Sequence, residues 1–222
     1  MADAIDDPTI PPLLGADRFQ PYVAVCGSAA DAIRLYAWNL EASAALWGGF
    51  AILEVCLRNA INARLSSLAG RGDWWNAASL HLHRDQRQRV NEAVSRATLE
   101  QGTAVTDGHV VAQLTLGFWV SLLTNRYHSS LWVPAVSHAF PHWALRRGDL
   151  HHRLETLRKV RNRLAHHEKV FNRNLLRDHQ DVLDVLAAIE PAVRDWVAHD
   201  SRLPAVLAVR ATTIAGQRPT SF

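Results

Sequence analysis

The chain has 222 residues, and 48% of them are apolar, a share that supports a sizeable core and excludes wholesale disorder. Its formal net charge of +3 is too small to indicate nucleic-acid binding by itself. The two cysteines, Cys26 and Cys56, have neither a CxxC nor a metal-ligand spacing, so we expect two small buried side chains in a reducing cytosol.

The N-terminal segment is acidic and lacks the apolar core of a signal peptide. The longest apolar run, residues 42–53, is too short to cross a bilayer. We therefore expect a cytoplasmic protein without membrane contact. Residues 1–17 are expected to form a flexible arm, residues 18–200 a single domain and residues 201–222 a C-terminal tail.

Apolar residues recur at helical spacing between residues 28 and 200, which predicts an all-α fold. Gly48 and Gly49 are expected to interrupt or kink the first long helical segment, because glycine disfavours helix interiors. Asp149 can cap the helix that follows it, and the last helix is expected to bend at Pro191. The predicted helices cover about residues 28–45, 50–68, 81–99, 109–124, 131–140 and 175–193, and one more starts near Asp149 and carries Arg161.

The most informative stretch of the chain, residues 160–171, brings three chemically useful side chains together. Arg161, Asn162 and His166 place a guanidinium, a carboxamide and an imidazole within six residues. A guanidinium matches phosphate oxygens with paired hydrogen bonds, and the imidazole proton can move near neutral pH. The pattern therefore predicts chemistry on a phosphate.

The spacing of this motif is not distinctive. Four Arg-x4-His pairs occur in the chain, where about one is expected by chance, and Arg194 with His199 is a formal rival. The context of Arg161 favours the first pair. Arg161 lies on an apolar helix stripe, where a guanidinium must be paired or functional because burying it alone is costly. The other residues of that stripe are Leu150, Leu154, Leu157 and Leu164.

The two ends of the motif do not share a helix face. Residues five apart on an ideal helix point about 140° away from each other. Arg161 and His166 can therefore act together only if the helix ends or distorts between them, or if the site is assembled across two chains.

A second polar group, Glu54, Arg58, Asn59 and Asn62, lies in an otherwise apolar predicted helix. Glu54 or Asn59 could hold the guanidinium of Arg161. Alternatively, Glu54 and Arg58, which are four residues apart, form an internal ion pair that fixes helix packing. Both interpretations stay open at this point.

Basic residues crowd around the motif, and ten of the 24 lie between Arg146 and Arg177. Such a cluster favours polyanions through phosphate contacts. A solvated arginine face would have the same composition. The candidates for RNA contact are Arg158, Lys159, Arg163 and Lys169.

Four segments resemble the Abi-like branch of the HEPN ribonucleases, in the same order along the chain. They are LYAWN (35–39), LEVCLRN (53–59), GFWV (117–120) and RNRLAHHE (161–168). This resemblance covers roughly residues 20–200. It implies an all-α, HEPN-like helical bundle with additional helices.

The same resemblance implies a metal-independent endoribonuclease that needs no cofactor and acts as a toxin in abortive infection, a phage defence. Arg161 would stabilise the scissile phosphate, and Asn162 would orient the arginine or a phosphate oxygen. His166 would move the proton of the RNA 2′-hydroxyl or protonate the leaving 5′-oxygen, with His167 as a spare imidazole. A homodimer with a composite active site is implied, together with RNA as substrate and a silencing partner, protein or RNA. Adenylylation is disfavoured, because Glu168 stands where the regulated HEPN toxins have a tyrosine.

Other function classes fit less well. A non-catalytic RNA-binding module of the same fold is the main alternative. A metalloenzyme is disfavoured, because the twelve histidines include no His-Glu-x-x-His spacing. The eight tryptophans are expected to pack in the core rather than stack on bases, with Trp74 and Trp75 the least certain pair.

Overall fold

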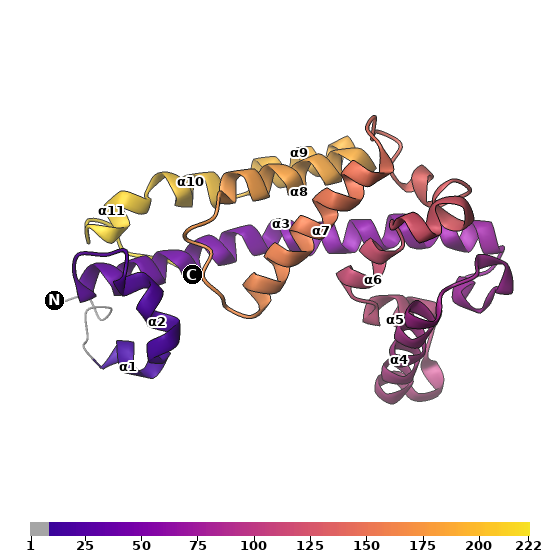
Figure 1. Cartoon of the computed structure of the whole chain (residues 1–222), viewed down its shortest axis with the longest axis horizontal. Coiled ribbons are helices and arrows are strands. Elements are labelled where there is room, and N and C mark those ends of the chain that lie inside the picture. The colour runs from indigo at the N-terminus through magenta and orange to yellow at the C-terminus, as the bar shows by residue number, and fades with distance from the viewer. Residues whose placement is uncertain (1–8) are drawn as a thin grey trace. The chain divides into compact units, whose positions relative to one another are not determined.

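The computed structural model describes residues 9–222, which are mainly helical and include no β-strand (Figure 1). The all-α class is therefore confirmed. The α-helices in chain order are α1 (Ile10–Leu14), α2 (Ala16–Val23), α3 (Ala29–Ala69), α4 (Arg84–Gln101), α5 (Asp107–Gln113), α6 (Leu116–Ser121), α7 (Arg147–Ala165), α8 (Leu175–Ile189), α9 (Pro191–Asp200), α10 (Leu203–Ala208) and α11 (Arg210–Ile214).

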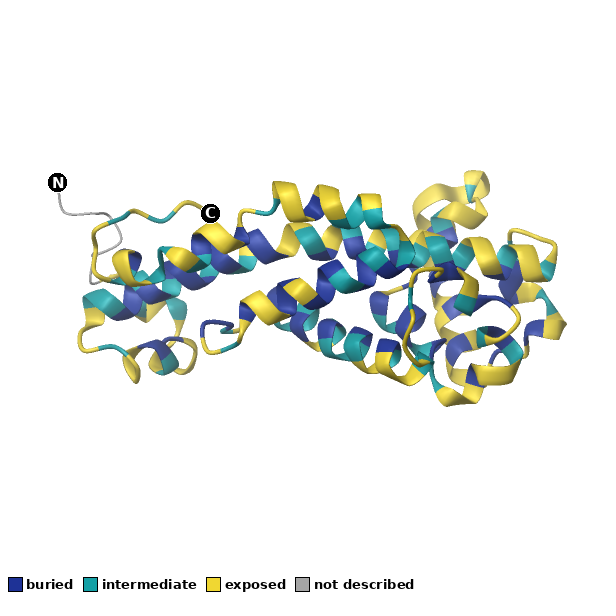
Figure 2. Ribbon diagram, turned by 90° about the horizontal axis from the view of Figure 1, so that it is seen from above, coloured by how far each residue is buried: buried dark blue, intermediate teal, exposed yellow. Residues whose placement is uncertain are grey.

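The predicted break at Gly48 and Gly49 is wrong, because α3 runs through both glycines without interruption. Each glycine costs a helix about 1 kcal/mol, whereas burying one large apolar side chain contributes about 1.5–3 kcal/mol. Buried side chains continue at helical spacing on both sides of the glycines, so burial prevails (Figure 2). These buried positions are Leu46, Phe50, Leu53, Leu57, Ile61 and Leu65.

The apolar character of α3 also bears on the expected lack of membrane contact. Its 41 residues include an 18-residue window with a mean hydropathy of 1.5, long and apolar enough to cross a membrane. Among residues 9–222 it is the one helix that meets this criterion. The core helix of a soluble protein meets it as well, so length and composition are weak evidence for a membrane span.

The described residues form two compact units. The first unit comprises residues 9–50, 160–180 and 197–222, and the second comprises residues 51–159 and 181–196. Helices α3, α7, α8 and α9 contribute residues to both units. The single domain expected over residues 18–200 stays a prediction.

Aromatic residues form the core of the first unit. The ring of Tyr22 on α2 lies 5.1 Å from that of Tyr36 on α3 and 4.8 Å from that of Phe171, centre to centre. Trp38, fully buried on α3, donates from its indole nitrogen to the carbonyl oxygen of Val206 on α10, at 2.9 Å. These contacts bring both ends of the described chain against α3 (Figure 1).

The segments expected at the two ends of the chain are partly helical. Of the expected arm, residues 1–8 lie outside the described residues, and residues 10–14 form α1. The expected tail contains α10 and α11, and beyond them Arg218 donates two hydrogen bonds of 2.8 Å to the carboxylate of Glu41. Glu41 is 1% exposed, so the end of the chain is tied to the core of the first unit.

Tryptophans form the core of the second unit. The rings of Trp74 and Trp75 lie 5.5 Å apart, and the Trp74 ring is 6.3 Å from Phe118 and 6.2 Å from Trp119. The indole nitrogen of Trp74 donates to Oδ1 of Asn62 at 2.8 Å. Both Trp74 and Trp75 are buried, so this pair belongs to the core.

The single helix expected over residues 109–124 is also wrong, because α5 ends at Gln113 and α6 begins at Leu116. Thr115 lies between them in an extended conformation, and its side-chain oxygen accepts from the backbone N–H of Phe118. Threonine is a good N-cap, which explains the new start.

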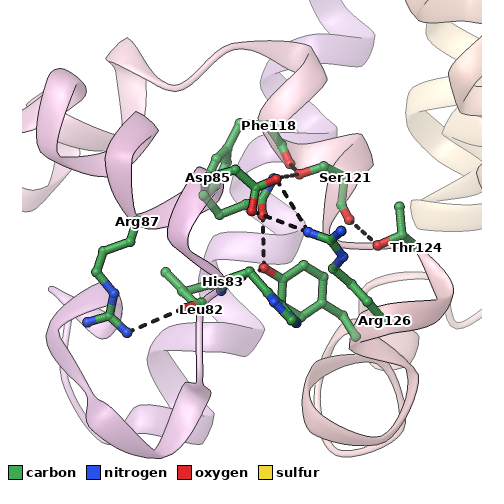
Figure 3. A network of polar contacts seen from close by, with 10 residues as sticks. Leu82, His83, Asp85, Arg87, Phe118, Ser121, Thr124 and Arg126 are labelled. Carbon is green, nitrogen blue, oxygen red and sulfur yellow. Dashed lines mark hydrogen bonds and ion pairs between the residues drawn. The ribbon is translucent and has the colours of Figure 1, made fainter.

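A polar network around Tyr127 holds this part of the second unit together (Figure 3). The Tyr127 hydroxyl accepts from the backbone N–H of His83 and donates to Gln86, both at 3.0 Å. The Gln86 amide then donates to Ser121 at 3.2 Å. The network links α4 to α6, and it is structural because Tyr127 and Gln86 are buried.

Candidate functional site

The predicted motif lies at the C-terminal end of α7, in the first unit. The backbone N–H of Glu168 donates to the carbonyl of Arg163 at 2.8 Å, and that of His167 donates to Leu164 at 3.1 Å. This pair of bonds is a Schellman motif, which ends the helix at Ala165 with His166 as the C-cap. His166 still donates its backbone N–H to the carbonyl of Asn162 at 3.0 Å, so the chain leaves helical geometry only at His167, and Arg161 and His166 keep the divergence of about 140°.

His167 takes the position that glycine usually occupies in this motif. Its φ of +54° lies in the left-handed region, which costs an L-residue roughly 1–2 kcal/mol. The guanidinium of Arg18 on α2 donates to the carbonyl oxygen of His167 at 2.8 Å and so stabilises this turn. Strained backbone of this kind is often found at functional sites.

Arg161 is half-buried, and its guanidinium carbon lies 5.4 Å from the centre of the Trp47 ring on α3. A cation over a tryptophan face gains about 0.5–2 kcal/mol, more as water is excluded. Trp47 is 38% exposed, so the ring also faces solvent. The sequence analysis did not identify Trp47, because it assigned the tryptophans to the core. The position of Arg161 on an apolar helix stripe did indicate that its guanidinium needed a flat apolar partner.

The other motif residues are accessible. Asn162 is half-buried, and its backbone carbonyl accepts from His166 N–H at 3.0 Å. His166 and His167 are both exposed. Arg161, whose guanidinium is held on an aromatic ring, thus lies about one helical turn before His166 and His167. Both imidazoles are accessible to solvent and to a substrate.

Glu54, Arg58 and Asn59 belong to the second unit, whereas Arg161 belongs to the first. A contact between Arg161 and these residues therefore stays a prediction. Glu54 is half-buried and Asn59 is exposed, while the Nε of Arg58 is buried and makes no hydrogen bond within the described part of the chain.

The four candidate RNA-contact residues are divided between the units. Arg163 and Lys169 lie in the first unit, and the Nε of Arg163 is 3.9 Å from a carboxylate oxygen of Glu168, both side chains being well exposed. An exposed pair at that distance is weak and leaves the guanidinium available. Arg158 and Lys159 lie in the second unit.

Arg158 is less available than its sequence position suggests. Its guanidinium donates to both carboxylate oxygens of Glu155, at 2.9 and 2.5 Å. This pairing lowers the pKa of Glu155 and raises that of Arg158. Lys159 is exposed and is the better candidate of the two.

Two of the rival Arg-x4-His pairs contact other residues than each other. Arg147 donates to the carbonyl oxygen of Leu123, and Arg194 pairs with the adjacent Asp195 at 2.6 Å. His199, the partner of Arg194 in spacing, lies 2.7 Å from Asp200. Within residues 9–222, no three His, Cys, Asp or Glu side chains come together as metal ligands would.

Comparison with known proteins returned no relative: no protein-family model, no curated protein and no solved structure matches the chain. The site is therefore interpreted from its residues and geometry.

Proposed function

We propose that the protein is a metal-independent endoribonuclease of the Abi-like HEPN type, with Arg161, Asn162 and His166 as its catalytic residues. The observation that carries this proposal is the arrangement at the end of α7. Arg161 is held over Trp47, and His166 is exposed immediately after the helix ends. A fixed cation one helical turn from solvent-reachable imidazoles is suited to a phosphodiester.

The proposed reaction is transesterification within the RNA strand. The 2′-oxygen attacks the adjacent phosphorus, a new O2′–P bond forms, and the P–O5′ bond breaks. The products carry a 2′,3′-cyclic phosphate and a 5′-hydroxyl. Arg161 stabilises the negative charge that builds on the non-bridging oxygens, and Asn162 orients the arginine or a phosphate oxygen.

Proton transfer requires a base at the 2′-oxygen and an acid at the 5′-oxygen. One imidazole does not reach both sides of an in-line displacement well. We propose that His166 acts as one of these two groups. The other group would come from the partner protomer of a homodimer whose active site is composite. His167 is a further imidazole at the same turn.

The biological setting that we propose is cytoplasmic: a toxin of phage defence by abortive infection, held inactive by a silencing partner, either protein or RNA. The alternative is a non-catalytic RNA-binding module with the same fold. The exposed basic side chains Lys159 and Arg163 would serve either function.

The experiment that tests the proposal is incubation of labelled total RNA with the purified protein in EDTA, alongside Arg161→Ala and His166→Ala. We expect cleavage by the wild type and loss of it in both variants. The matched control is His199→Ala, an exposed histidine with the same spacing to an arginine, which should cleave normally. RNA binding without cleavage by the folded wild type would favour the binding module.

A further inference from the structure

A second candidate site lies in the first unit, away from the motif residues. It is an open pocket of about 550 Å³ between the start of α3, the loop after α7 and helix α11. Small-molecule sites typically measure about 300–1,000 Å³. A bare phosphate ion would fill only a small part of this volume, so the pocket fits a larger organic ligand.

Two guanidiniums border the pocket, and both are held in place. The guanidinium carbon of Arg210 lies 4.8 Å from the centre of the ring of Trp38, which is itself fully buried. Within residues 9–222, no hydrogen bond or ion pair takes up the N–H groups of Arg210. Its charge is therefore fixed on an aromatic ring while its donors stay available.

Arg173 is held by the buried carboxylate of Asp178. Its Nε and one Nη donate to the two oxygens, at 2.9 and 2.7 Å, and the Asp178 side chain is 5% exposed. The second Nη lies outside this ion pair and can donate to a ligand. Arginines fixed in this way lose little conformational entropy when they bind a phosphate.

The remaining walls combine apolar and hydrogen-bonding groups. Leu35 and Phe171 are buried side chains that line the pocket, and the Phe171 ring is braced by Tyr22. Asn172 and Asp31 add a carboxamide and a carboxylate. These groups can accept from and donate to the edge of a base or the hydroxyls of a ribose.

Cys26 also lines the pocket, but it is not suited to nucleophilic chemistry. Burial and the charge of Asp31 raise the pKa of its thiol, which keeps the thiol protonated at neutral pH. The groups of the pocket that are suited to a ligand are therefore its arginines and polar side chains.

We propose that this pocket binds a nucleotide unit, with its phosphate on Arg210 and Arg173 and its ribose or base against the remaining wall of the pocket. The nucleotide can be a free nucleoside monophosphate or the phosphorylated end of an RNA strand, since both present the same chemistry. The loop from His167 to Arg173 joins the end of α7 to this pocket, and the backbone N–H groups of Val170 and Phe171 in it donate to Oδ1 of the buried Asn39. The inference does not depend on ribonuclease activity.

The test is calorimetric titration of the full-length His166→Ala protein with each of the four nucleoside monophosphates. A second titration uses a 5′-phosphorylated, fully 2′-O-methylated oligonucleotide that cannot be cleaved by 2′-hydroxyl attack. Arg210→Gln should weaken binding at least tenfold, because a charge-assisted hydrogen bond contributes about 1.5–3 kcal/mol. Arg202→Gln, an exposed arginine of the same unit outside the pocket, should bind as the parent does.

Gly27→Phe is the second variant, and it retains every charged group of the pocket. A Cβ at Gly27 would meet no atom within 4 Å, so the larger side chain can be accommodated at the pocket wall and should block the ligand. If a nucleoside monophosphate binds the parent protein and Gly27→Phe abolishes this binding, the ligand is a free nucleotide. If only the oligonucleotide binds and Gly27→Phe abolishes that binding, the ligand is the phosphorylated end of an RNA strand. No binding of either ligand, or binding that survives both Gly27→Phe and Arg210→Gln, would overturn the proposal.

Discussion

The guanidinium carbon of Arg161 lies 5.4 Å from the centre of the Trp47 ring, so the arginine of the motif is positioned by an aromatic face. The two residues are 114 positions apart in the sequence. Trp47 thus becomes a positioning residue of the proposed active site, and its effect on cleavage can be separated from its effect on folding.

Trp47→Leu should reduce RNA cleavage about fivefold, because the loss of a partly exposed cation–π contact costs about 1 kcal/mol. Trp47→Phe should retain more activity than Trp47→Leu, since it keeps an aromatic face. Cleavage rates at saturating RNA provide the measurement. The matched control is Trp196→Leu, another exposed tryptophan, which should cleave like the wild type. Equal rates for Trp47→Leu and the wild type would contradict the positioning role.

His167→Gly should stabilise the protein by about 1 kcal/mol, because glycine adopts the left-handed conformation of this C-cap without strain. Cleavage should persist, since the proposed mechanism assigns the proton transfer to His166. Chemical denaturation and the RNA assay check the two parts separately. His167→Ala keeps the strain and removes the imidazole, so it should not gain stability. A destabilised His167→Gly protein would show that the imidazole contributes more than the strain costs.

The ion pair between Arg218 and Glu41 predicts that truncation of the C-terminus lowers the stability of the protein. Removing residues 217–222 deletes Arg218 and leaves Glu41 buried without its partner, which should lower the melting temperature. The truncation combined with Glu41→Gln should recover part of the loss, because a neutral amide is less costly to bury than a carboxylate. Thermal unfolding of the three proteins would measure this. No change in melting temperature on truncation would show that the pair does not contribute.

The stability of the protein should fall below about pH 6.5. His179 is buried, and burial lowers the pKa of its imidazole from the ordinary value of 6.5. Near its ordinary pKa, the His179 imidazole therefore binds a proton more readily in the unfolded chain than in the folded protein. The free energy of unfolding is highest above the unfolded pKa of His179 and decreases as the pH falls through that pKa. Denaturant titrations from pH 8 to pH 5 should show this decrease. His179→Leu should flatten it, and an unchanged slope in that variant would assign the effect to other groups.

Mixing two inactive variants tests the composite site. If one active site takes Arg161 from one protomer and His166 from its partner, Arg161→Ala and His166→Ala should complement each other after subunit exchange. About a quarter of the wild-type activity is expected, because half of the dimers are mixed and each holds one intact site. A mixture that remains inactive while mixed dimers are present would confine the site to a single chain.

Much of the fold followed from periodicity and from capping residues. The polar helix expected over residues 81–99 is α4, and Pro191 separates α8 from α9. Asp149 does cap α7, although it does so from inside the helix, accepting from the backbone N–H of Arg146 at 3.2 Å. These features depend on neighbours in the sequence, so local reasoning could find them.

The break at Thr115 is a local capping effect that the sequence analysis overlooked, whereas the other differences arose where distant residues decide the outcome. The continuity of α3 through Gly48 depends on side chains that are buried by the rest of the chain. The contact between Trp47 and Arg161 joins residues from different helices, and no spacing in the sequence indicates it. The pocket beside Arg210 likewise combines three separate segments, which periodicity cannot bring together.

The most direct measurement is the chemistry of the ends that the protein leaves on RNA in the presence of EDTA. The proposed mechanism predicts 5′-hydroxyl and 2′,3′-cyclic phosphate ends, produced by the wild type and absent with Arg161→Ala and His166→Ala, while DNA of the same sequence stays intact. Ends with a 3′-hydroxyl and a 5′-phosphate, or equal cleavage by the variants, would contradict the account.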